Sequence, residues 1–195
     1  MKKLLFTFLL SSSLFAQEKA TDLFNANISV IGIGIQYEKA LSDNFTAVGS
    51  LDYMGGFRYS YSDFYGSDFD YILTTSLSLE GRYYYNFDRR IDKGRNTKNN
   101  SGNYIALKGN FIPDWLTASN GDRLNVNPQG SLTVNYGLKR SFAQNFFYEF
   151  YTGLGLAFYQ EDKLNWDNEF QNYNSSKKTE IGTTIDLGFR VGYNF

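Results

Sequence analysis

Apolar and polar side chains alternate along two long segments of the chain, 71–87 and 180–195. Because successive side chains of a β-strand point to opposite faces, a period of two predicts strands with one apolar and one polar face. Five further segments follow the same period with more noise, at about 28–38, 45–59, 103–112, 130–140 and 146–160. The pattern therefore predicts an all-β fold with seven clearly readable strands.

The links between these strands alternate in length. Short turns at 40–44 and 141–145 and the polar link 88–102 fall at one end, and longer polar loops are expected opposite them at 60–70, 113–129 and 161–178. This order predicts antiparallel strands that run up and down. Closing them into an even-numbered barrel requires an eighth strand, which we place around 22–29, with an unresolved boundary to the second strand. A sixteen-stranded barrel would need roughly 160 residues in strands alone and leaves no room for these loops.

Composition removes several kinds of chemistry from consideration. The 195 residues include no His and no Cys, which excludes the usual catalytic triads, thiolate nucleophiles, zinc sites and disulfides. The net charge of −1 gives no electrostatic reason to bind nucleic acid. We therefore expect no enzyme activity, no metal and no cofactor.

Residues 1–16 have the pattern of a secretory signal peptide. Lys2 and Lys3 precede an apolar run at 4–10 and small residues at 11–13, and Ala16 is followed by polar residues. Cleavage after Ala16 would leave 17–195 as one domain. The alternative is an uncleaved anchor helix, but the apolar run is far shorter than the roughly 18–20 residues that span a bilayer.

The two faces of the predicted strands differ in chemistry. The apolar face carries Tyr and Phe near the strand ends, which is typical of the aromatic belts of membrane barrels. The polar face carries acids and bases in equal number, and this balance suits a closed interior in which ions pair. These residues are Glu38, Asp52, Glu80, Glu149 and Asp186 with Arg58, Arg82, Lys108, Lys139 and Arg190. A secreted, soluble lipocalin-like barrel with the two faces reversed stays open as an alternative.

The chain ends in Phe195, preceded at every second position by Tyr193, Val191 and Phe189. This ending resembles the carboxyl-terminal assembly signal of outer-membrane proteins. The segment 37–45 is also similar to the first tight turn of outer membrane β-barrel or porin family proteins. Residues 17–195 as a whole resemble the small OmpA/OmpX-type barrels. The resemblance implies a monomeric transmembrane β-barrel in the cell outer membrane, surrounded by outer-membrane lipid and inserted by the barrel-assembly machinery, which would recognise Phe195.

The loops hold the remaining candidate sites. Four aromatic residues are candidates either for contact with an unknown surface ligand or for anchoring the barrel rim: Trp115, Trp166, Phe170 and Tyr173. Asp63, Asp68 and Asp70 have oxygen ligands for a hard cation, but we expect them to be solvated. The link 88–100 carries five bases against two acids, and we expect a solvated turn there in preference to a phosphate or peptidoglycan contact.

The functional expectation is a non-enzymatic outer-membrane barrel with a salt-bridged, closed lumen and a structural envelope or surface-recognition role. A narrow channel for small solutes or ions is the main alternative, because the lumen is polar. An eight-stranded barrel is only wide enough for side chains to fill it, which favours the closed interior. The resemblance itself says little about function, because proteins with the same barrel architecture have many different roles.

Overall fold

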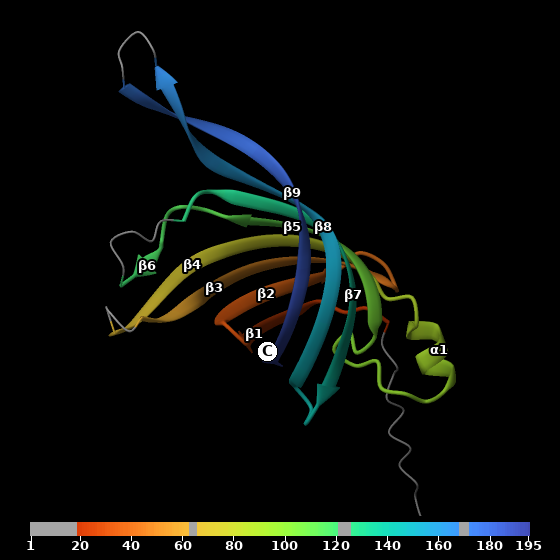
Figure 1. Ribbon diagram of the computed structural model, residues 1–195. Coiled ribbons are helices and arrows are strands. Elements are labelled where there is room, and N and C mark those ends of the chain that lie inside the picture. Colours follow the sequence, from red (N-terminus) through yellow and green to blue (C-terminus); the bar gives the residue numbers. More distant parts are fainter. Residues whose placement is uncertain (1–18, 63–65, 121–125, 168–171) are drawn as a thin grey trace, which may run out of the picture.

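The computed structural model describes residues 19–62, 66–120, 126–167 and 172–195 (Figure 1). Its strands are β1 (Leu23–Ser29), β2 (Gly32–Ala40), β3 (Phe45–Ser62), β4 (Gly66–Tyr83), β5 (Asn103–Ile112), β6 (Ala118–Ser119), β7 (Gln129–Phe142), β8 (Phe146–Asp167) and β9 (Asn172–Asn194). The short helix α1 (Phe87–Asp92) lies between β4 and β5. Among the described residues, no helix is long and apolar enough to cross a membrane.

The eight long strands form a closed antiparallel ring. Each long strand pairs with the next one along the chain, and β1 pairs with β9 from Asn25↔Asn194 to Ser29↔Arg190. The two-residue β6 adds only a short edge to β4. The prediction of an all-β, up-and-down barrel is therefore confirmed, including the eighth strand. The unresolved boundary between the first two strands falls at Val30 and Ile31, in a two-residue turn.

The ring has two different ends. The "α1 end" holds the start of β1, the turns at 41–44 and 143–145, the link 84–102 that contains α1, and Phe195. Here the Phe195 N–H donates to the Phe24 carbonyl oxygen at 2.9 Å, which joins the last residue of the chain to the first strand. The opposite "hairpin end" holds the turn at 30–31 and the other three connections, as the alternating links predict.

Two segments predicted as loops are mostly strand. Pairing between β3 and β4 continues to Ser62↔Gly66, and pairing between β8 and β9 continues to Asp167↔Asn172. The prediction of long loops at 60–70 and 161–178 was therefore wrong. Backbone hydrogen bonds alone can pair the two strands of a hairpin. Apolar and polar residues alternate only where one face of a strand contacts apolar surroundings and the other does not, so the sequence carried no sign of these strand ends. The two hairpins extend well beyond the short β1–β2 turn, so the wall of the ring is uneven in height (Figure 1).

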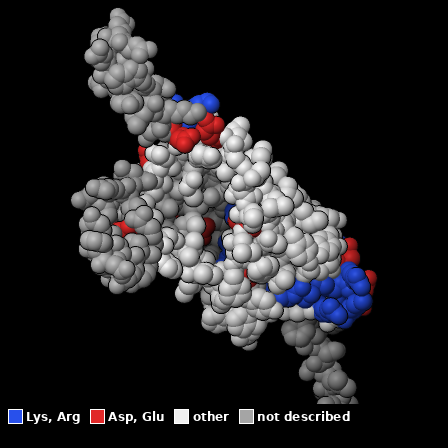
Figure 2. All heavy atoms as spheres, viewed as in Figure 1, with Lys and Arg blue, Asp and Glu red and all other residues white. Residues whose placement is uncertain are grey.

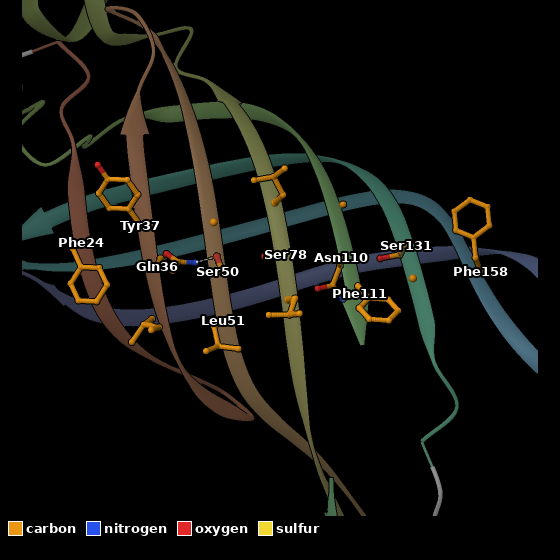
Figure 3. Close-up of a pocket in the computed structure, with 16 residues that line it drawn as sticks. Phe24, Gln36, Tyr37, Ser50, Leu51, Ser78, Asn110, Phe111, Ser131 and Phe158 are labelled. Carbon is orange, nitrogen blue, oxygen red and sulfur yellow. Dashed lines mark hydrogen bonds between the residues drawn. The ribbon is translucent and has the colours of Figure 1, made fainter. Parts of the chain in front are cut away.

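The inner face of the ring is polar and the outer face is apolar. In β1 the side chains of Asn25 and Asn27 are buried, whereas those of Phe24 and Ile28 are exposed. The same arrangement continues around the ring, and the exposed fraction reaches 69% for Leu79 and 72% for Ile185. Figure 3 shows part of the wall, where Phe24, Tyr37, Leu51, Phe111 and Phe158 project from the strands and Gln36 donates to Ser50. This distribution is the reverse of that in an ordinary water-soluble barrel.

Candidate functional site

A compact group of charged side chains fills the interior toward the α1 end. We call it the ion cluster. Its centre is the Arg82 guanidinium, whose nitrogens lie 2.8 Å from Glu149 Oε1, 3.0 Å from Glu80 Oε2 and 3.8 Å from Glu38 Oε2. Two further pairs complete it: Lys139 Nζ to Glu38 Oε2 at 2.8 Å, and Arg190 Nε to Glu149 Oε2 at 3.1 Å. The cluster thus comprises Glu38, Glu80, Arg82, Lys139, Glu149 and Arg190, three acids and three bases.

Strand register explains why these residues meet. Glu149 lies directly opposite Lys139 on one neighbouring strand and opposite Arg190 on the other, so one row across β7, β8 and β9 alternates in sign. Arg82 and Glu38 reach the same place from the other side of the ring. Every side chain in the cluster is nearly inaccessible to solvent. Buried charges are tolerated only when they are paired and hydrogen-bonded, and this row supplies the pairing.

Aromatic side chains close the α1 end of the interior around the ion cluster. The Tyr84 hydroxyl donates to Glu38 Oε1 at 2.7 Å, and the Tyr104 hydroxyl donates to Glu149 Oε1 at 2.6 Å. The Arg82 guanidinium stacks 4.5 Å from the centre of the Tyr104 ring. Phe87, the first residue of α1, stacks on Tyr84 at 4.5 Å, and all three rings are fully buried. Helix α1 and its link therefore form a cap over this end of the ring.

The hairpin end of the interior is hollow. A cavity of about 400 Å³ lies there between the inner wall and the β1–β2 turn. Lys108 Nζ lies 2.9 Å from Asp186 Oδ2 beside it, and Asn135 Nδ2 donates to the same oxygen at 2.8 Å. Asp52 also lines this cavity, without an ion pair to any described side chain. In Figure 2 the surface is hollowed near its centre, and atoms of charged residues are visible within the hollow. The cavity reaches Arg190, and thus ends at the ion cluster.

The structure places the predicted interior charges in two groups. Six form the ion cluster, and Lys108, Asp186 and Asp52 lie around the cavity at the hairpin end. Arg58 lies on β3, and its side chain is outside the described part of the molecule. Sequence reasoning missed the aromatic side chains of the cap, Tyr84, Phe87 and Tyr104. Tyr104 occupies a polar position in the alternation of β5, and Tyr84, one residue after β4, continues the polar positions of that strand, so the alternation was an available signal that both point inward.

The carboxyl-terminal residues lie along the seam between β9 and β1. Phe189, Val191 and Tyr193 are exposed on the outer face. The ring of Phe195 lies 5.7 Å from that of Phe24 and 5.3 Å from that of Tyr193, measured between ring centres. This arrangement places the predicted assembly signal on an accessible surface, and its role in assembly stays a prediction.

The predicted surface aromatics are described only in part. Trp115 is 49% exposed and lies with Leu116 beside the outer-face residues Leu51, Tyr53 and Leu77. Its position favours an anchor on the wall over a free surface contact. Phe170, Asp63 and the side chains of Trp166, Tyr173 and Asp68 lie outside the described residues. Within the described part of the chain, no three acidic side chains converge as metal ligands would.

Comparisons of the chain with protein families, with curated proteins and with solved structures find no match. The described residues form an apolar outer face, an interior closed by paired charges toward one end, and a cavity toward the other.

Proposed function

We propose that the protein is a non-enzymatic outer-membrane β-barrel with a closed lumen. The observation that carries the proposal is the apolar outer face, which continues around the whole ring while the interior is polar and charge-paired. Soluble monomers rarely expose contiguous apolar patches larger than a few hundred Å². A bilayer would cover this face, and the closed ring leaves no unpaired strand edge in the hydrocarbon.

The ion cluster and its aromatic cap argue against the alternative of a narrow channel. A conducting path would have to pass between Arg82, Glu149 and Tyr104, which are in contact and excluded from solvent. The cavity at the hairpin end stops at this barrier. We therefore assign the barrel a structural envelope or surface-recognition role, in which the β3–β4 and β8–β9 hairpins present the protein to the outside.

The remaining parts of the proposal follow from the sequence. Residues 1–16 would direct export, Phe195 with its neighbours would be recognised by the assembly machinery, and the ring would function as a monomer in contact with lipid. The soluble lipocalin-like alternative would need an apolar interior. The described interior is instead dominated by Arg, Lys, Glu and Asn side chains.

Two measurements on the refolded full chain test this proposal. We expect the unboiled protein to migrate differently from the boiled protein on a denaturing gel, because a closed membrane barrel resists detergent. In planar bilayers we expect no discrete conductance steps, with insertion verified separately by protease protection. Discrete steps from the inserted protein would favour the channel, and an unshifted band from a soluble protein would favour the lipocalin-like barrel.

A further inference from the structure

A basic pocket lies at the α1 end, between the link that contains α1 and the edge of β7. Its volume is about 290 Å³, and its lining includes no acidic residue. Figure 2 shows Lys and Arg atoms gathered on this part of the surface. The lining residues are Tyr85, Asn86, Arg89, Arg90, Lys93, Arg95, Asn103 and Arg140.

Backbone oxygens hold the two least exposed guanidinium groups of the pocket. Arg90 is 9% exposed, and its Nε and Nη2 donate to the Asn96 carbonyl oxygen at 3.2 and 2.6 Å. Arg140 Nη1 donates to the carbonyl oxygens of Gly102 and Lys139 at 2.8 and 2.7 Å. Carbonyl groups fix the position of a guanidinium group but do not neutralise it. The pocket is therefore built around two oriented cations that retain their full charge.

The other three cations of the pocket, Arg89, Lys93 and Arg95, are exposed at its rim. Within the described part of the chain, none of the five makes an ion pair with a carboxylate, although Asp88 and Asp92 lie in the same link. Burial, followed by repulsion from Arg140 and Arg95, lowers the pKa of Arg90 from its usual value. Like charges held together without a counterion favour the binding of an anion.

The pocket borders the aromatic edge of the outer face. The Tyr85 and Tyr136 hydroxyls are 3.1 Å apart, and Asn103 Nδ2 donates to the Tyr136 hydroxyl at 2.8 Å. Tyr136, Phe142 and Tyr148 are all exposed on this side of the ring. Tyr side chains concentrate where a membrane barrel meets the lipid head groups. In the proposed membrane location, the cations would therefore lie at the depth where lipid phosphates are found.

We propose that this pocket binds the phosphate group of an anionic phospholipid, whose acyl chains lie along the outer face beside Tyr136 and Tyr148. The assignment to a lipid rests on the proposed membrane location, whereas the affinity for phosphate follows from the pocket alone. Guanidinium groups match phosphate oxygens in pairs, and each basic residue near a charged lipid surface adds to the attraction. The proposal favours the phosphate contact at 88–100 over the solvated turn that the sequence predicts there.

Native mass spectrometry of the full chain in detergent, titrated with dioleoyl phosphatidylglycerol, tests the proposal. The test variant is Arg89→Gln with Lys93→Gln and Arg95→Gln, which leaves the two anchored guanidinium groups in place. The control variant is Lys163→Gln with Lys177→Gln and Lys178→Gln, which removes the same charge from the β8–β9 hairpin at the opposite end of the ring. We expect lipid affinity to fall about a hundredfold in the test variant, from the loss of three basic contacts. The control should change it by less than about twofold, because distant exposed charges are screened.

Inorganic phosphate, followed by ³¹P line broadening, separates the two possible sources of the anion. We expect weak binding of phosphate alone and much tighter binding of the lipid. If phosphate alone binds as tightly as the lipid, the lipid assignment is overturned. Equal losses of lipid affinity in the test and control variants, or no binding of either lipid or phosphate, would overturn the proposal that the pocket binds an anion. The gel shift above tests the membrane location separately, so failure of the proposed function is distinguishable from failure of this site.

Discussion

Replacing Glu149 with Gln is expected to lower the free energy of unfolding by about 3–5 kcal/mol. Glu149 contacts two buried cations at once, Arg82 at 2.8 Å and Arg190 at 3.1 Å. The amide keeps the size of the side chain but removes its charge, so the ion cluster is left with three bases and two acids. An uncompensated charge in a solvent-excluded interior is costly, whichever way the surrounding side chains adjust.

Urea unfolding of the refolded barrel, followed by circular dichroism, measures this loss. The control is Lys39→Gln, which removes a solvent-exposed partner of Asp22 and should leave the midpoint unchanged. The double variant Glu149→Gln with Arg190→Gln restores charge balance and should recover part of the loss. Coincident transitions for wild type and Glu149→Gln would show that the cluster does not support the fold.

Replacing Gly137 with Val is expected to destabilise the barrel by about 2–5 kcal/mol, through overpacking and a lost hydrogen bond. Gly137 faces the interior, where the Tyr104 ring lies against its backbone, and a Cβ there would overlap the ring. Moving the ring would break its hydroxyl contact with Glu149 and its stacking on Arg82. The glycine is therefore required by the close approach of the cap.

Gly49→Val is the matched control for this substitution. Gly49 also lies within a strand, but it faces outward, and nothing lies within 4 Å of a Cβ built on it. Valine has a higher strand propensity than glycine, so we expect no loss of stability here. The same unfolding experiment compares the two variants, and equal losses at both positions would contradict the packing argument.

The strands were predictable because the two faces of the wall contact different surroundings. Leu79 and Glu80 are neighbours in the chain, and the side chain of Leu79 points outward while that of Glu80 points inward. Such pairs produce the alternation of apolar and polar residues from which the strands were predicted. The β1–β2 turn could not be located from the sequence, because a nearly continuous apolar run crosses it. This run comprises Ile28, Val30, Ile31 and Ile33. Helix α1 could not be predicted because Phe87, its buried apolar residue, also continues the apolar positions of the preceding strand.

The composition of the ion cluster could be predicted, but its pairing could not. A charged residue at a polar position of the strand alternation is expected to point inward, so the members of the cluster can be read from the sequence. Lys139 and Glu38 are 101 residues apart, and they meet only because the ring closes with a particular stagger between strands. The basic pocket forms where the irregular link 84–102 packs against β7. An irregular segment has no periodic sequence pattern, so this contact could not be predicted.

The membrane location is the central claim, and the absence of cysteine allows it to be tested at single positions. Leu154→Cys places a unique thiol on the outer face, where Leu154 is 68% exposed, and Ser78→Cys places one in the interior cavity. Each variant is labelled with a small fluorophore and reconstituted in vesicles. We predict that nitroxide-bearing acyl chains quench the label at 154 strongly and the label at 78 weakly. Quenching at 154 by aqueous iodide, with none by the acyl-chain nitroxide, would contradict the account.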